Sequence, residues 1–218
     1  MNKEWSELNK TMQNQLKKKE TYDNGISTLF ELRDRLMRVL DELRNELKRE
    51  DFDAIPFINS DGYHSKTIAY SIWHIFRIED IVAHSILNND EQVFFSQCYR
   101  ERINSPIITT GNELVKQQIA DFSEQLDINE LYSYIYDVKV STENIIKNLS
   151  FDDLKKKFAD ETKAYLRNLK VVSSDEKAIW LIDYWCNKDI RGLIQMPFSR
   201  HWIMHIEACL RIKDKLNK

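Results

Sequence analysis

Glycine and proline are scarce in this chain: its 218 residues include only four glycines and three prolines. A fold rich in β-sheet needs many tight turns, and those turns depend on glycine and proline. Long helices need few such residues. The scarcity therefore favours an all-α fold, and the length is sufficient for one well-packed domain, residues 1–218.

Cysteine is also rare, and the three cysteines, Cys98, Cys186 and Cys209, lie far apart in the sequence. Their spacing indicates neither a disulfide framework nor a CxxC zinc site and fits a reducing cytoplasm. Long apolar runs are missing, since no window approaches the roughly 18 uncharged apolar residues of a membrane span. The first 20 residues are charged throughout, unlike a signal peptide. We therefore expect a cytoplasmic protein that does not enter the membrane.

An excess of charge of one sign is absent as well. The net charge is −3, from 32 basic and 35 acidic residues, which gives no electrostatic reason to expect nucleic acid or an anionic membrane as partner. We expect a small-molecule substrate instead. A homodimer formed through helix faces is compatible with the pattern.

Apolar residues recur every three or four positions in several segments, which is the period of an amphipathic helix. Within residues 1–22 they predict a lead-in helix, followed by a turn in which Gly25 is suited to a left-handed conformation. The long helices predicted after this turn cover residues 26–47, 67–87, 113–149 with a division near Asp127, and about 197–213.

The segment 67–87 is apolar around much of its circumference, which is typical of a central helix, and Thr67 or Ser65 is its candidate N-cap. Four principal helices joined by a few long connections indicate a four-helix bundle over residues 26–213.

Three of the five histidines attract attention. His201 and His205 are four residues apart in the last helix, so both imidazoles lie on one face. His74 lies within the apolar run IAYSIWHIFRI, where an unpaired polar ring would be costly. Its partner is a metal ion, or a backbone carbonyl or carboxylate from another element. His64, in a loop, and His84, on a different side of the helix from His74, are interpreted as surface or capping residues.

Three imidazoles from two helices would suit a divalent ion of zinc, nickel or iron and leave a coordination position open for water or substrate. Three neutral ligands also leave the ion its full charge, which acidifies a bound water or thiol. The alternative is a helical binding or stress-response protein without catalytic activity, in which the histidines are structural.

The motifs WHIFRIED, residues 73–80, and HWIMHIE, residues 201–207, occur in an order that resembles the DinB/YfiT-like (DinB family) superfamily of four-helix-bundle metalloenzymes. The resemblance covers about residues 26–213, with its motifs confined to 67–80 and 198–209. It implies that His74, His201 and His205 bind the metal.

Members of that superfamily include bacillithiol transferases and mycothiol-dependent maleylpyruvate isomerases. The resemblance therefore implies a metal-dependent transferase or hydrolase-like enzyme, with a low-molecular-weight thiol as cofactor that attacks an electrophilic substrate. The long connections 88–111 and 150–175 exceed the compact family pattern, so the substrate does not follow from the resemblance.

Other residues near the histidines have alternative interpretations. Arg77 and Arg200 could hold a carboxylate or the acidic groups of a thiol cofactor, or form surface salt bridges. Glu79 and Asp80 are expected to pair with Arg77 or with other helices, and Cys209 is interpreted as a buried apolar residue. The aromatic residues of the same segments are interpreted as core rather than as a substrate pocket: Tyr70, Trp73, Trp180, Tyr184, Trp185 and Trp202.

Overall fold

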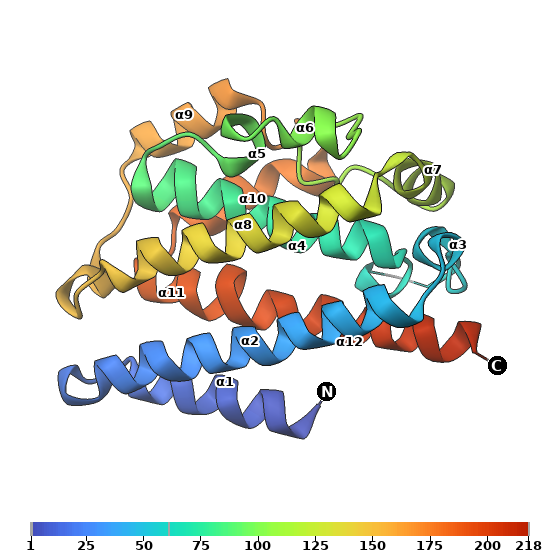
Figure 1. Ribbon diagram of the computed structural model, residues 1–218. Helices are drawn as coiled ribbons and strands as arrows, with labels where there is room; N and C mark the ends of the chain where they lie inside the picture. The colour runs from blue at the N-terminus through green and yellow to red at the C-terminus, as the bar shows by residue number, and fades with distance from the viewer. Residues whose placement is uncertain (1, 61, 218) are drawn as a thin grey trace.

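The computed structural model describes residues 2–60 and 62–217, and most of this part of the chain is helical (Figure 1). No β-strand occurs within the described residues, where one isolated bridge joins Lys157 to Asp189. The prediction of an all-α fold is therefore confirmed. Within the same residues, no helix combines the length and the apolar character needed to cross a bilayer.

Four long helices occupy the centre of the molecule. They are α2 (Tyr22–Glu46), α4 (Ile68–Asp80), α8 (Ile128–Lys147) and α12 (His201–Leu216). Helix α4 packs against both α8 and α12, while α2 contacts α8 and α12 from the other side. A π-helix, η3 (Ile81–Asn88), continues α4, and a second one, η5 (Met196–Arg200), leads into α12.

The remaining elements cover the outside and the ends of these helices (Figure 1). Helix α1 (Lys3–Gln15) runs along α2. Helix α7 (Gln117–Gln125) ends just before Asp127, which caps α8 by accepting a hydrogen bond from the Glu130 backbone N–H, so the predicted division is confirmed. The shorter elements are η1 (Lys19–Thr21), α3 (Arg49–Asp53), η2 (Gly62–His64), α5 (Val93–Ser96), α6 (Tyr99–Arg102), η4 (Asp152–Lys155), α9 (Asp160–Leu169), α10 (Glu176–Cys186) and α11 (Ile190–Gln195).

Gly25 does not adopt the predicted left-handed conformation. It lies in the first turns of α2 and is buried, and positive φ is found instead at Gly62 and Gly111. A Cβ atom at Gly25 would lie 2.8 Å from Leu16 Cδ2. The glycine is therefore needed because α1 approaches α2 closely at this point, not because a turn requires it.

Helix α4 is the most enclosed element. Thr67 caps it by accepting a hydrogen bond from the Tyr70 backbone N–H, and every residue from Ile68 to Asp80 is buried. Its apolar side chains pack around the whole circumference, as the sequence predicts for a central helix. The charged side chains of α4 consequently need partners inside the protein.

Glu79 meets this requirement through Arg33 of α2. The Arg33 guanidinium donates to both Glu79 carboxylate oxygens, at 2.7 and 2.9 Å, and both side chains are fully buried. Arg33 also donates to the Phe198 carbonyl oxygen and to Glu143 of α8, each at 3.1 Å. Trp202 of α12 donates its indole N–H to Glu79 at 2.8 Å. This network joins α2, α4, α8 and α12.

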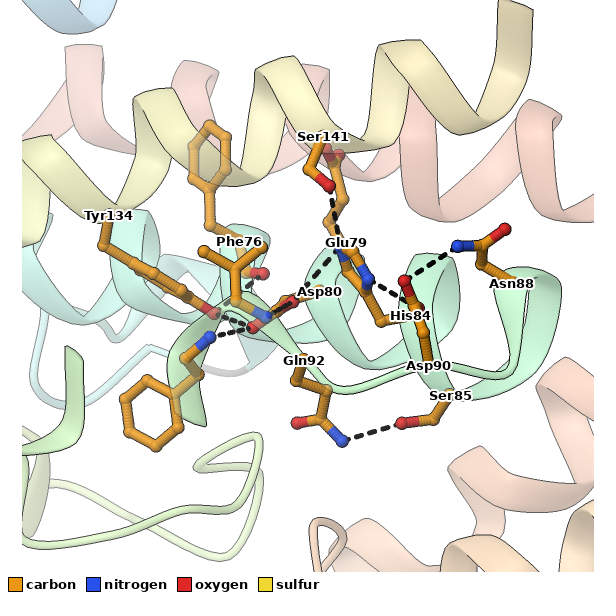
Figure 2. Close-up of polar contacts among 12 residues, drawn as sticks. Phe76, Glu79, Asp80, His84, Ser85, Asn88, Asp90, Gln92, Tyr134 and Ser141 are labelled. Carbon is orange, nitrogen blue, oxygen red and sulfur yellow. Dashed lines mark hydrogen bonds and ion pairs between the residues drawn. The ribbon is translucent and has the colours of Figure 1, made fainter. Parts of the chain in front are cut away.

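Asp80 connects α4 to α5 and α8 through hydrogen bonds (Figure 2). Its carboxylate accepts hydrogen bonds from the backbone N–H groups of Val93 and Phe94 at the start of α5, both at 2.9 Å. It also accepts one from the Tyr134 hydroxyl of α8, at 2.9 Å. Both acidic residues therefore pair with other helices, as expected from the sequence.

His84 is not a surface residue, contrary to the prediction, because it is only 4% exposed. Its Nδ1 lies 2.7 Å from Asp90 Oδ1 and its Nε2 lies 3.0 Å from Ser141 Oγ of α8 (Figure 2). The segment is enclosed on every side from Ile68 to Ile86, so a position on a different side of the helix from His74 is buried as well.

Replacing Arg33 by methionine is expected to reduce the free energy of unfolding by about 3–5 kcal/mol, because Glu79 would remain as a buried charge without its partner. Arg35→Met is the matched control on the same helix, since Arg35 forms partly exposed ion pairs and its loss should cost less than about 1 kcal/mol. Urea unfolding followed by circular dichroism measures both values. Equal losses in the two variants would show that the buried network does not hold the helices together.

Candidate metal centre

The side chains of His74, His201 and His205 converge between α4 and α12. One ring nitrogen from each lies within 4.8 Å of the others. The ring centroids are 5.1 Å apart for His74 and His201, 4.8 Å for His74 and His205, and 4.6 Å for the pair on α12. All three rings are buried, with at most 8% of each residue exposed. The structure thus brings together the three histidines singled out in the sequence.

The spacing of these nitrogens suits one metal ion. Bonds of about 2.0–2.1 Å to imidazole place the nitrogens of a shared tetrahedral ion about 3.3–3.4 Å apart. The three nitrogens lie within 4.8 Å of one another, so they would approach by no more than about 1.5 Å to hold one ion. Three imidazoles without a carboxylate are a donor set for borderline divalent ions rather than for calcium or magnesium.

His74 is oriented by the loop that precedes α7. Its Nδ1 lies 2.7 Å from the Thr110 carbonyl oxygen, which can only accept, so Nδ1 carries the proton. The lone pair of Nε2 is then available for a ligand, which is the usual arrangement of a metal-binding histidine. The Tyr70 ring stacks on the imidazole, with 5.4 Å between centroids and an interplanar angle of 11°.

The same loop is held to α4 by two further side chains, and we call this group of contacts the carbonyl clamp. The three donors are spaced to lie on one face of α4. Each contacts a different carbonyl oxygen: Tyr70 OH that of Gly111 at 2.9 Å, His74 Nδ1 that of Thr110 at 2.7 Å, and Arg77 that of Ile108 at 2.8 and 3.0 Å. The clamp explains how an irregular segment keeps a defined position beside the histidines.

Arg77 is part of the clamp and therefore does not make the substrate contact predicted from the sequence. Arg77 is fully buried, and besides Ile108 it donates to Gln92 Oε1 at 2.6 Å. Arg200, the other predicted contact, is exposed. Neither arginine lines the cavities beside the histidines. Arg77 lies on the same face of α4 as His74, but its guanidinium donates to the Ile108 carbonyl and to Gln92, whereas Arg200 is exposed.

Burial keeps the three imidazoles neutral. It lowers the pKa of His74 to about 4, against a smaller opposing effect of the bond to the Thr110 carbonyl. It also lowers the pKa of His201 and His205 well below the usual value, and the neighbouring imidazoles act in the same direction. Near pH 7 no proton therefore competes with a metal ion for these nitrogens.

His201 carries an unsatisfied polar atom. Its Nδ1 is buried and has no hydrogen-bond partner among the described residues. Buried polar atoms nearly always have a partner, so an exception at this place requires an explanation. An ion bound by the three rings would supply one.

Two cavities meet at the histidines, and His74, His205 and Asn112 line both. The larger one, of about 550 Å³, we call the lysine cavity because Lys66, Lys116 and Lys177 line it. The smaller one, of about 280 Å³, we call the aromatic cavity, and its distinctive lining residues are Trp180, Tyr184, Trp185, Met196, Pro197 and Met204.

The interpretation of the aromatic residues as core holds for some and not for others. Trp73 and Trp202 are fully buried, whereas Tyr70, although buried, also lines the lysine cavity. Trp180, by contrast, is 48% exposed, and it lines the aromatic cavity. Helical spacing cannot distinguish these cases, since the face of α10 that carries Trp180 is apolar whether it covers core or cavity.

Cys209 is a buried free cysteine, as predicted, and burial raises the pKa of its thiol to about 12. It does not belong to the three-histidine group. His64, interpreted from the sequence as a surface or capping residue, is partly buried in η2 and also lies outside that group.

Comparison with known proteins supports the fold and leaves the family open. No family model matches the chain, and no curated protein matches it. A crystal structure described as a conserved protein from Enterococcus faecalis is similar, with a TM-score of 0.60 and 14% sequence identity over 85% of this chain and 93% of the other. A likeness at that identity shows a shared fold alone. Membership of the DinB family stays a prediction.

Gly111 is expected to be required for the carbonyl clamp. Its φ is +75°, and a Cβ atom there would lie 3.0 Å from Tyr70 Cε2. Gly62 has a similar φ of +66° with no neighbouring atom within 4 Å, so Gly62→Ala isolates the cost of the backbone conformation. We expect Gly111→Ala to destabilise the protein by at least about 1 kcal/mol more than Gly62→Ala. Equal melting temperatures for the two variants would show that the contact with Tyr70 is unimportant.

The metal-free protein is expected to lose stability as the pH falls below about 6.5. In that range the unfolded chain binds a proton at position 74, whereas the folded state, with a pKa of about 4, does not. Between pH 7.5 and pH 5 this difference amounts to about 2 kcal/mol for His74. Urea unfolding at the two pH values should show a correspondingly smaller loss in His74→Gln. An identical pH dependence in that variant would contradict the assignment.

Proposed function

We propose that the protein is a divalent-metal-dependent enzyme and, more specifically, a low-molecular-weight-thiol S-transferase that acts on an electrophilic small molecule. The observation that carries the proposal is the convergence of three buried, neutral imidazoles at the point where two cavities meet. The DinB/YfiT resemblance points in the same direction.

His74, His201 and His205 would hold the ion, which we expect to be zinc, nickel or iron. Bound by three neutral ligands, such an ion supplies positive charge that lowers the pKa of a water or thiol beside it. The Thr110 carbonyl keeps His74 in the required tautomer, and Tyr70 restricts the rotation of its ring.

The two cavities favour a reaction between two molecules over simple metal storage. A thiol cofactor and an electrophile that entered from different cavities would meet at the histidines. In the proposed reaction the sulfur loses its proton to solvent and forms a bond to the electrophilic carbon. From a chlorinated substrate the chloride departs with its electron pair. In a maleyl compound the electron pair of the carbon–carbon double bond moves to the adjacent carbon, which takes a proton from solvent. The apolar walls formed by Trp180, Tyr184 and Met204 favour an apolar electrophile and exclude water.

Metal analysis tests the proposed centre directly. Protein purified without a histidine tag should contain about one divalent ion per chain, since the three histidines form one site. His205→Ala should lose the ion, whereas His64→Ala, which changes a histidine outside the three-histidine group, should retain it. The absence of bound metal under every loading condition would refute the metalloenzyme and favour a binding protein with structural histidines.

Activity is tested separately with metal-loaded protein. Chlorinated and maleyl compounds, combined with a panel of low-molecular-weight thiols, should yield the S-conjugate. His74→Ala should reduce kcat/KM by at least about 100-fold, since a metal ligand is lost. If the protein binds metal but no combination of thiol and electrophile reacts, the S-transferase assignment is refuted and the metal centre is not.

A further inference from the structure

Three lysine side chains give the lysine cavity positive charge. Lys66, Lys116 and Lys177 line it, and no acidic side chain lines it among the residues that the structure describes there. Some partly buried lysines elsewhere in the protein are paired: Lys139, for example, binds Asp34 and Glu143 at 2.8 Å each. In the described ranges, by contrast, no ion pair involves any of the three cavity lysines.

Lys66 is the most enclosed of the three, and its position is defined. Its ammonium nitrogen lies 4.9 Å from the centroid of the Tyr70 ring, which in turn stacks on His74. The cation–π contact therefore holds the charge next to the candidate metal centre. Burial and the charge of Lys177 lower the pKa of Lys66 to about 8, which indicates an ammonium group that lacks a compensating anion.

Helix α10 borders both cavities. Lys177, in its first turn, lines the lysine cavity, while Trp180, Leu181 and Tyr184 line the aromatic cavity. A ligand that lies along this helix would have one end near ammonium groups and the other against apolar rings. The histidines that line both cavities lie between these two ends.

We propose that the lysine cavity binds the anionic group of an amphipathic organic acid, a carboxylate or phosphate, whose apolar part occupies the aromatic cavity. Lys66 and Lys177 are the anion-binding residues, and Lys116 adds positive charge at the rim. The inference deepens the proposed function, because it assigns a ligand class to the same site. In this proposal the anionic group is bound by lysines from other elements and not by Arg77 and Arg200, the residues that the sequence suggested.

Binding of small probes tests this inference. We expect 4-phenylbutyrate and phenyl phosphate to bind in calorimetric titrations of both metal-free and metal-loaded protein, and the uncharged 4-phenylbutanamide to bind at least ten-fold more weakly. A difference between the two anions would identify which anionic group the site prefers. The indole fluorescence change on binding should become smaller in Trp180→Phe, because Trp180 is one of the two tryptophans that line the aromatic cavity. Equal binding of the amide and the acid would overturn the inference.

The lysines are tested with the double variant Lys66→Gln/Lys177→Gln. Its dissociation constant for phenylbutyrate should rise at least ten-fold. The matched control is Lys10→Gln/Lys215→Gln, which removes two exposed lysines that line neither cavity and should leave the constant unchanged. Thermal melting of both variants confirms that they fold.

The outcomes separate this inference from the proposed function. Anion binding that depends on the two lysines in metal-free protein supports the inference even if no metal is ever bound. Binding that requires the metal and is unaffected by the lysine substitutions would mean that the anion contacts the ion directly, which overturns the lysine site and leaves the metalloenzyme proposal intact.

Discussion

The buried pair between Arg33 and Glu79 is the interaction on which the central helices depend. Removing two charges from water is costly, and a buried pair often adds little net stability compared with apolar residues. Its importance here lies in geometry. Glu79 also accepts from Trp202, the neighbour of His201 in the chain, so the pair that joins α2 to α4 helps to position the start of α12. A packing arrangement that separated Arg33 from Glu79 would leave a charge unpaired in the core, and such arrangements are therefore disfavoured.

Helix α4 extends this principle, because its polar residues are directed to different neighbours. His74 faces α12 and the clamped loop, Glu79 faces α2, and Asp80 faces α5 and α8. Each bond is satisfied inside a closely packed environment, where an unpaired group would cost more than the bond contributes. The candidate metal centre thus lies on a helix that is mostly apolar and whose few polar side chains each need a partner on a neighbouring element.

Much of the helical layout could be predicted from the sequence, because apolar periodicity marks α2, α4, α8 and α12 directly. The three histidines could also be predicted, since a polar ring inside an apolar helix needs a partner and two more rings lay at helical spacing. The partners of the buried His84 could not, because Asp90 follows in a loop and Ser141 comes from α8. Nor could the lysine cavity, since Lys66 and Lys177 come from separate segments and meet only through tertiary packing.

The carbonyl clamp has a consequence for how this site can change over time. Its acceptors are backbone oxygens of residues 108, 110 and 111, which every amino acid possesses, so most substitutions in the loop would leave the contacts intact. Position 111 is restricted by its positive φ and by the adjacent tyrosine ring, and position 110 by its complete burial. The sequence of such a loop can change during evolution while its carbonyl oxygens continue to orient the His74 imidazole. Relatives could therefore share the centre without a similar loop sequence. The spacing of the clamp donors along α4 is a better guide to such relatives than the sequence of the loop.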